Sequence, residues 1–437
     1  MAPPLGYRRI PLRRGATRRG AGARGPAPDG RSRPAGKGRS PPKEVCIAKE
    51  LKSVAAPVER ALLVGAPRKG SPESRDVDEH LDELARLVDT AGAEVAGRVV
   101  QHIAAPTPDL YIGRGKAEEI GRQVRDIGAT VVVFDEELSP RQGKNLEEAL
   151  GMRVMDRTEV ILDIFALRAR SREARMQVEL AQLEYLLPRL TRMWAHLSRI
   201  RGGIGLRGPG ETQLETDRRM IRTKIGALKQ KLGEVADHRA RLRGRTRERD
   251  VLRVALVGYT NAGKSSLLRA LTGAEAHVED RLFATLDTQS REVSLRPTPH
   301  TLHPTPTRIR VTDTVGFIRK LPHDLVASFR ATLEEAADAD LIVHVVDASH
   351  PAWDLQAEVV GEVLHGLAGG DAAGGPEPRI LMALNKLDRL APNERVARLQ
   401  DAQARGWDAA GTSAVTAGGV ESLKARLAAA SQPPTAM

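Results

Sequence analysis

A glycine-rich loop between an apolar strand and a helix constrains this chain more than any other feature. The stretch GYTNAGKS, from Gly258 to Ser265, fits the pattern G-x-x-x-x-G-K-[ST] and lies between the apolar run VALVG and the helix-like run SSLLRAL. Two glycines, Gly258 and Gly263, let the backbone wrap phosphates and direct its N–H groups inward. Lys264 supplies positive charge, and the Ser265 hydroxyl suits Mg²⁺. The stretch therefore predicts a phosphate-binding loop in front of a helix N-terminus.

Three short motifs that follow have the order of a guanine-nucleotide domain. DTVG ends the apolar strand TRIRVTD, so Asp313 suits a water-mediated Mg²⁺ contact and Gly316 a γ-phosphate contact. NKLD follows the strand ILMAL, and its Asp388 can accept hydrogen bonds from guanine N1–H and N2–H₂, a pair that adenine lacks. Asn385 opens this motif and supports the loop. TSA, at residues 412–414, lies where a backbone N–H can bind guanine O6.

A second hydroxyl ligand for Mg²⁺ is expected between the phosphate-binding loop and DTVG. The segment LFATLDTQSR offers Thr285 and Thr288. Spacing alone does not decide between these two threonines, and we favour Thr285.

The residue after DTVG raises a mechanistic question. It is Phe317, where many related GTPases have a glutamine that orients the attacking water. A phenyl ring cannot hydrogen-bond this water, so intrinsic hydrolysis should be slow, on the order of 10⁻⁴–10⁻³ s⁻¹. A partner macromolecule could complete the site. A K⁺ ion near Asn261 could also do so by placing positive charge beside the phosphates, whereas the alternative is that Asn261 only favours the loop's backbone geometry.

The region before the loop motifs alternates between strands and helices. ALLVGAP, EVAGRVVQHI and TVVVFDEEL are typical of strands, and VDEHLDELARLVDTAG and KAEEIGRQVRDIG are typical of helices. The second helix is expected to end at Gly128. Residues 46–166 therefore form a predicted small α/β domain.

Two apolar seams in residues 167–247 predict an antiparallel helical hairpin. The first seam consists of Met176, Leu180, Leu183, Leu187, Leu190, Trp194 and Leu197. The second consists of Ile221, Ile225, Leu228, Leu232, Val235 and Leu242. Pro188 should kink the first helix. The GTPase domain then extends over residues 248–432.

The stretch RGGIGLRGPGETQLETDRR would form the tip of this hairpin, with its glycine-rich part at residues 202–210. It follows a helix rather than a strand, so it does not fit a second phosphate-binding loop. Its glycines permit close approach to RNA and its arginines offer partners for phosphates, whereas a plain connecting loop is the alternative. The candidate RNA contacts at this tip are Arg201, Gly203, Gly205, Arg207, Gly208 and Gly210.

Most of the formal net charge of +12 lies in the first 45 residues, which contain 12 Lys and Arg but only 2 Asp and Glu. This segment is also rich in Pro and Gly, and we expect a disordered basic tail. The tail is an arm for RNA phosphates, a segment without a specific role, or the product of a translation start assigned too early.

Composition excludes several other classes of protein. The single cysteine, Cys46, excludes an internal disulfide framework and a multi-cysteine metal site. The chain has no apolar run of the roughly 18 residues that a membrane span needs, and no secretory h-region. We therefore expect a cytoplasmic monomer.

The motifs RGGIGLRGPGETQLETDRR, GYTNAGKSS, LFATLD, DTVGF and NKLD together resemble the HflX family of ribosome-associated GTPases. YIGRGKAEEI, DRTEVILDIFALRARSREARMQVELAQLEYLLPRL and LSR are also similar to that family, so the resemblance covers about residues 55 to 430. It implies an α/β fold with an N-terminal α/β subdomain, a long antiparallel helical hairpin and a P-loop GTPase domain with a mostly parallel sheet. It also matches Thr285 to the Mg²⁺ threonine of the family.

The resemblance further implies function. HflX proteins bind the large ribosomal subunit, many dissociate stalled or stressed ribosomes, and the ribosome stimulates their GTP hydrolysis. The hairpin tip is the part that reaches toward the peptidyl-transferase centre. The chain departs from the family where LFATLD continues with Thr288 and Gln289 instead of Pro-Thr. Because the helix-like run GGVESLKARLAAA follows TSA shortly before Met437, we expect that the C-terminal domain that many members carry is missing.

These motifs and the resemblance define the candidate site residues. The catalytic candidates are Lys264, Thr285 and Gly316, and the metal ligands are Ser265 and Thr285. The GTP-binding candidates are Gly258, Tyr259, Thr260, Asn261, Ala262, Gly263, Lys264, Ser265, Phe283, Ala284, Thr285, Leu286, Asp287, Asp313, Thr314, Val315, Gly316, Asn385, Lys386, Leu387, Asp388, Ser413 and Ala414.

Three functions remain open at this point. The first is a Mg²⁺-dependent GTPase that splits ribosomes, and the second is a GTP-gated ribosome-binding factor that does not split them. The third is ATP-dependent RNA remodelling by the N-terminal domain, an activity that the resemblance also suggests. GRGK, at residues 113–116, is too short for a phosphate-binding loop and fits a turn before a helix.

Overall fold

The computed structural model describes residues 58–190, 211–246, 251–273, 282–283, 285–286, 288–295, 307–320, 339–368 and 379–430. The chain divides into two compact units, Met1–Val58 and Glu59–Met437, and the description below concerns the second. The predicted basic tail and the glycine-rich part of the predicted hairpin tip, residues 202–210, lie outside the described residues.

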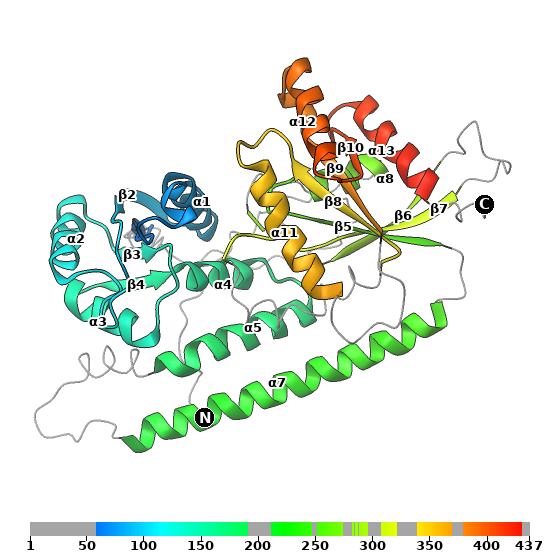
Figure 1. Cartoon of the computed structure of the whole chain (residues 1–437). Helices are drawn as coiled ribbons and strands as arrows, with labels where there is room; N and C mark the ends of the chain where they lie inside the picture. The colour runs from blue at the N-terminus through cyan, green and yellow to red at the C-terminus, as the bar shows by residue number, and fades with distance from the viewer. Residues whose placement is uncertain are drawn as a thin grey trace, which may run out of the picture. The chain divides into compact units, whose positions relative to one another are not determined.

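The first sheet is parallel and has the strand order β2-β1-β3-β4 (Figure 1). Its strands are β1 (Arg60–Gly65), β2 (Glu94–Val100), β3 (Val131–Phe134) and β4 (Arg153–Asp156). The helices are α1 (Val77–Ala91), α2 (Arg114–Ile127), α3 (Pro140–Leu150) and α4 (Arg157–Arg168), and a 3-10 turn covers Pro72–Ser74. Residues of α1 and α4 pack on one face of the sheet, and residues of α2 and α3 on the other. Burial of both faces explains why β1 and β3 are nearly continuous apolar runs.

Local signals set the helix boundaries in this domain. Gly128 follows α2 with a φ of 64°, the left-handed conformation that ends a helix and that the sequence predicted at this position. Ser139 precedes α3 and forms a capping box with Gln142, because each side chain accepts a hydrogen bond from the other residue's backbone N–H.

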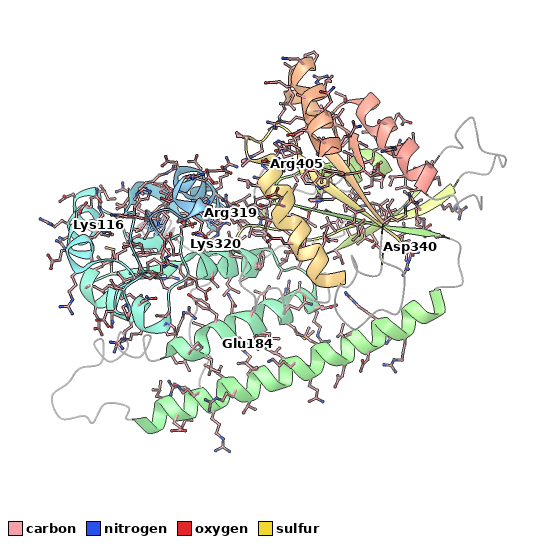
Figure 2. The ribbon with its side chains drawn as sticks, in the orientation of Figure 1. Lys116, Glu184, Arg319, Lys320, Asp340 and Arg405 are labelled. Carbon is pink, nitrogen blue, oxygen red and sulfur yellow. The ribbon has the colours of Figure 1, made fainter. Side chains whose placement is uncertain are left out.

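Helices α5 (Arg172–Leu186) and α7 (Glu211–Thr246) run antiparallel and side by side, as the apolar seams predicted (Figure 1). Leu180 and Leu228 are buried, and ion pairs flank the seam: Glu184 with Lys229 at 2.8 Å, and Glu173 with Arg239 at 2.7 Å. Figure 2 labels Glu184 on α5. Where a kink was expected at Pro188, α5 instead ends, and a 3-10 turn covers Leu187–Arg189. The proline ring has no N–H to continue the helical hydrogen bonds.

The second sheet has the order β10-β9-β8-β5-β7-β6, in which only β6 is antiparallel to its neighbour. Its strands are β5 (Leu252–Gly258), β6 (Gln289–Leu295), β7 (Thr307–Asp313), β8 (Leu341–Asp347), β9 (Arg379–Asn385) and β10 (Ala409–Gly411). The helices are α8 (Lys264–Thr272), α11 (Trp353–Ala368), α12 (Pro392–Ala404) and α13 (Ala417–Ala430), and a 3-10 turn covers Leu387–Arg389. Because β5, β7, β8 and β9 are mutually parallel, their carboxyl ends lie at one edge, where the loop motifs follow. The predicted fold class is confirmed.

The two sheets contribute to one shared hydrophobic cluster. Residues of α1 and α4 belong to it, and so do Leu282, Phe283, Leu286, Phe317 and Ile318 from the segments around LFATLD and DTVGF. This continuity joins the N-terminal domain to the second sheet, and nothing in the local sequence patterns predicted it. Among the described helices, none is long and apolar enough to cross a membrane.

Phe134 gives a test of the first sheet's core. Its side chain is fully buried between β1 and the helices α2 and α3. We expect Phe134→Ala to lower the free energy of unfolding by about 3–5 kcal/mol, because the substitution leaves a cavity. Urea denaturation followed by circular dichroism measures this change. Val415→Ala is the control: this side chain is 83% exposed, so its effect should stay within about 0.5 kcal/mol, and equal effects of the two substitutions would contradict the assignment.

Candidate nucleotide site

The stretch GYTNAGKS forms a tight loop between β5 and α8. Asn261 has a φ of 60° and Gly263 a φ of 93°, both left-handed, so the backbone reverses sharply before the helix. A Cβ atom at Gly258 would collide with the carbonyl oxygen of Val345 on β8. Ala262 is buried beneath the loop. These contacts explain the glycines that the motif requires at its two ends.

Lys264 reaches back over this loop from the start of α8. Its buried ammonium group donates to the carbonyl oxygens of Gly258 at 3.1 Å and Tyr259 at 3.0 Å. Burial lowers the pKa of Lys264 to about 8, an effect that the nearby carboxylate of Asp313 opposes. The geometry suits a cation that gains its full charge when phosphate oxygens enter the loop.

Three oxygen-bearing side chains meet beside Lys264. Ser265 Oγ lies 2.7 Å from Thr285 Oγ1 and donates to Asp313 Oδ2 at 2.6 Å. The other carboxylate oxygen of Asp313 is buried without a hydrogen-bond partner. Burial raises the pKa of Asp313, although Lys264 and Ser265 act in the opposite direction. Hydroxyl and carboxylate oxygens are ligands that Mg²⁺ prefers, so this donor set fits the metal.

The motif DTVGF lies directly against the phosphate-binding loop. A Cβ atom at Gly316 would come 2.9 Å from the Cα of Thr260 and 3.1 Å from the Nζ of Lys264. Phe317 donates its N–H to the Gly258 carbonyl at 3.1 Å and accepts from the Thr260 N–H at 2.7 Å. The Phe317 side chain is buried in the shared cluster. Consequently, Gly316 and Phe317 lie against the phosphate-binding loop through their backbone groups alone.

The remaining residues of DTVG support the strand end. Thr314 is buried, and its hydroxyl donates to the Leu256 carbonyl at 2.8 Å, while Val315 packs against the shared cluster. Thr260 has a buried hydroxyl without a hydrogen-bond partner, next to Gly316. A hydroxyl in this position can donate to a phosphate oxygen.

NKLD and TSA come together at the carboxyl end of β9. Asn385 is buried and links three parts of the site, because it donates to the Ala262 carbonyl at 2.8 Å and accepts from the Ala414 N–H at 3.3 Å. The exposed carboxylate of Asp388 accepts from the Ser413 hydroxyl at 2.6 Å. Lys386, with a φ of 60°, pairs with Asp347 at 2.7 Å. The carboxylate and the backbone of TSA thus lie side by side, as guanine recognition requires.

Asp347 was not among the predicted residues. The signal that could have identified it is its position at the carboxyl end of β8, the strand that pairs with β9. Leu387, a predicted residue, lies in the 3-10 turn and packs against the cluster around Trp353.

The segment LFATLD is described in part. Phe283 and Leu286 are buried against the N-terminal domain, and the Phe283 ring meets Phe165 of α4 edge-on, with 4.7 Å between centroids. Any nucleotide contact of these two residues is therefore made by the backbone. Ala284 and Asp287 lie outside the described residues.

The lowered pKa of Lys264 predicts pH-dependent nucleotide binding. Below about pH 8 the lysine is protonated in the free protein, whereas above it binding must first restore the proton. We expect the affinity for GDP to fall as the pH rises from neutral to one unit above that pKa. Fluorescence titration measures it, with Lys264→Met as the control that binds weakly at every pH. An affinity that rises over this range would contradict the role of Lys264.

The position of Asp388 predicts which purine base the site selects. Asp388→Asn replaces an acceptor oxygen by an NH₂ donor, which opposes guanine N2–H₂ and suits xanthine O2. We expect GTP affinity to fall by about tenfold or more and xanthosine triphosphate to bind better than before. Competition titration with both nucleotides checks this. Unchanged GTP affinity would remove Asp388 from the site.

Three protein-family profiles match the chain in sequence order. They are "GTP-binding GTPase N-terminal" over residues 78–166, "GTP-binding GTPase Middle Region" over residues 168–246, and "50S ribosome-binding GTPase" over residues 253–386.

Curated relatives extend this match. The GTPase HflX of Caldanaerobacter subterraneus is 49% identical over 78% of this chain and 75% of its own length. The GTPase HflX of Lacrimispora saccharolytica is 50% identical over 73% and 72%, and that of Escherichia coli 47% over 71% and 70%. A GTP-binding protein of Sulfolobus solfataricus, solved with GDP, aligns with 86% of this chain and 99% of its own at 23% identity and a TM-score of 0.44. On its sequence and its three matched regions, the chain belongs to the HflX family of GTPases and hydrolyses GTP.

Proposed function

We propose that this GTPase binds the large ribosomal subunit and dissociates stalled or stressed ribosomes, with hydrolysis stimulated by the ribosome. The observation that carries the proposal is α7, a helix of 36 residues and about 54 Å that immediately precedes the GTPase domain. Its exposed basic side chains include Arg219, Arg222, Lys231 and Arg241. Such a helix suits contact with RNA phosphates over a long surface.

The nucleotide chemistry follows from the residues that meet at the sheet edge. We assign Ser265 and Thr285 as Mg²⁺ ligands, with Asp313 acting through water, and Lys264 as the partner of the β- and γ-phosphates. Bound Mg²⁺ would neutralise charge that develops during phosphoryl transfer. The Gly316 N–H is assigned to the γ-phosphate. Since Phe317 is buried, no side chain at that position orients the attacking water, and contact with the ribosome would complete the site.

Two explanations account for an asparagine at position 261, and GTP turnover in KCl and in NaCl distinguishes them. Its left-handed backbone conformation favours asparagine for a purely local reason. A K⁺ ion beside its exposed side chain would instead add positive charge near the phosphates. Higher turnover in KCl than in NaCl supports K⁺, and equal turnover supports the local explanation.

The N-terminal domain gives little support for ATP-dependent RNA remodelling. GRGK does not form a loop: Gly113 caps α2, and Lys116 in its first turn pairs with Glu119 at 2.7 Å. No described strand of the first sheet is followed by a phosphate-binding motif.

Sedimentation of ribosomes tests the proposal. We expect GTP, or an analogue that resists hydrolysis, to shift monosomes toward subunits in the presence of the protein, and GDP to have no effect. Deletion of residues 202–210 should abolish the shift and leave GTP binding intact. Binding without any change in the ratio of subunits to monosomes would identify a GTP-gated binding factor instead.

The exposed basic side chains of α7 can be tested separately. Changing Arg219, Arg222 and Lys231 to Gln should weaken binding to large subunits and lower its salt dependence, because fewer counterions are released. Lys116→Gln on α2 is the matched control and should bind as the unmodified protein does. Equal salt dependence for both variants would contradict a phosphate contact at α7.

A further inference from the structure

A cavity of about 690 Å³ lies between α11 and the strands β8 and β9, on the face of the second sheet that α11 covers (Figure 1). His344 of β8 and Met382 of β9 are register partners on this face, and both line the cavity together with Ile380. None of the described residues that line it is among the candidate nucleotide residues. The volume is within the range of cavities that bind small molecules.

Helix α11 forms the opposite wall of the cavity. Ala357, Gly361 and Leu364 line it and are four and three positions apart, so they lie on one face of the helix. A Cβ atom at Gly361 would meet no neighbouring atom within 4 Å, because the space in front of this glycine belongs to the cavity. The walls formed by the sheet and the helix are thus largely apolar, which suits an apolar ligand body.

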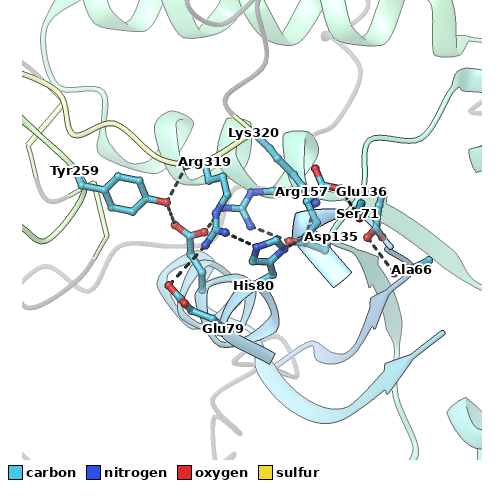
Figure 3. A network of polar contacts seen from close by, with 12 residues as sticks. Ala66, Ser71, Glu79, His80, Asp135, Glu136, Arg157, Tyr259, Arg319 and Lys320 are labelled. Carbon is cyan, nitrogen blue, oxygen red and sulfur yellow. Dashed lines mark hydrogen bonds and ion pairs between the residues drawn. The ribbon is translucent and has the colours of Figure 1, made fainter. Parts of the chain in front are cut away.

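His344 is the polar group at the base of the cavity. Its side chain is 3% exposed, and its Nε2 atom has no hydrogen-bond partner among the described residues. Burial lowers the pKa of His344 to about 4, and the charge of Lys264 acts in the same direction, so the ring is neutral near pH 7. Buried polar groups normally have partners, as Asp135 has in Arg157 and Lys320 (Figure 3). An unpaired nitrogen beside a cavity therefore indicates a ligand group that hydrogen-bonds to it.

Carboxylates surround the mouth of the cavity. Apart from the neutral histidine, the charged side chains among its described lining residues are all acidic: Glu358, Glu362 and Asp408, which are exposed. Glu358 pairs with Arg405, labelled in Figure 2, at 3.0 Å, and Asp408 pairs with Arg426. These two arginines leave the Glu362 carboxylate available to another cation. The charge at the mouth favours a positively charged ligand group over a negative one.

We propose that this cavity binds a small organic amine, with an apolar body between α11 and β9, a hydroxyl group toward His344 and a protonated amine toward Glu362. A hydroxyl group suits the histidine because it can donate to, or accept from, a neutral imidazole nitrogen. The amine stays at the exposed mouth, where its charge remains partly hydrated. The site is separate from the nucleotide site, and the proposal does not depend on any contact with the ribosome.

Compounds that share one body and differ in one group test the class of ligand. Tyramine carries the phenolic hydroxyl, the ring and the amine, whereas 4-hydroxyphenylethanol and 4-hydroxyphenylacetate replace the amine by a neutral and an anionic group. We expect tyramine to bind about threefold more tightly than the alcohol and on the order of tenfold more tightly than the acetate. Phenethylamine, which lacks the hydroxyl, should bind about fivefold more weakly than tyramine. Ligand-observed NMR titrations of the full chain with GDP measure these affinities.

Two substitutions test the location of the site. Gly361→Phe places a ring in the cavity and should weaken tyramine binding roughly tenfold or more, since the ligand body loses its space. His344→Phe keeps a ring but removes Nε2, so tyramine should bind about fivefold more weakly while phenethylamine binds as before. A general loss of structure would instead weaken both compounds equally. Circular dichroism and GDP affinity should be unchanged in both variants.

Gly226→Phe on α7 is the matched control, because a Cβ atom there also meets no neighbouring atom within 4 Å. This variant should bind tyramine as the unmodified protein does. Absence of tyramine binding to the unmodified protein, or equal affinity for tyramine and 4-hydroxyphenylacetate, would overturn the proposal. So would unchanged tyramine affinity in folded Gly361→Phe. An equal loss of tyramine and phenethylamine in His344→Phe would overturn the contact with the histidine.

Discussion

Burial of both nucleotide-facing segments in a core shared with the N-terminal domain is the constraint on which the site depends. The Phe283 ring lies edge-on against Phe165, and Phe317 is buried in the same cluster. Such an aromatic pair contributes about 0.5–1.5 kcal/mol beyond the burial of its area. Thr285 is only two residues from Phe283, so this packing limits where its hydroxyl can lie. Contacts outside the nucleotide site thereby add to those inside it that hold Thr285 Oγ1 2.7 Å from Ser265 Oγ.

Charged groups inside this interface give it a specific register. Arg157 is 3% exposed and satisfies two carboxylates at once, and Asp135 also receives Lys320. Breaking a buried ion pair of this kind costs about 3–5 kcal/mol, since each charge loses a partner that water cannot readily replace. An apolar interface has no charges that must meet, whereas these ion pairs and the hydrogen bond of Tyr259 to Glu83 favour one alignment of the phosphate-binding loop with α1.

Burial in the cluster shared with the N-terminal domain explains why a phenylalanine, Phe317, follows DTVG. A glutamine there would serve the attacking water, but it could not be buried without a partner for its amide. Phe317 instead docks the segment on the N-terminal domain, and the proposed mechanism assigns the chemistry to backbone groups, Lys264 and Mg²⁺. With phenylalanine in place of glutamine at this position, we expect slow intrinsic GTP hydrolysis that a bound partner stimulates.

The nucleotide motifs, their order and the helical seams could be predicted because each depends on neighbours close in sequence. Gly128 as a helix end, GYTNAGKS between a strand and a helix, and the buried Leu180 and Leu228 of the hairpin all follow from local patterns. The spacing of LFATLDTQSR did not separate Thr285 from Thr288, because hydroxyl position depends on how the segment packs.

Tertiary structure alone decided the interface. Tyr259 meets Glu83 across 176 positions, and Arg319 meets His80 across 239. Periodicity shows that a helix has a buried face, but it contains no information about which distant segment covers that face. The sequence by itself therefore determined that this chain binds and hydrolyses a guanine nucleotide, since short motifs contain the residues for that chemistry. Only the folded chain determined what holds those motifs in position, because long-range contacts arise from the packing of whole elements.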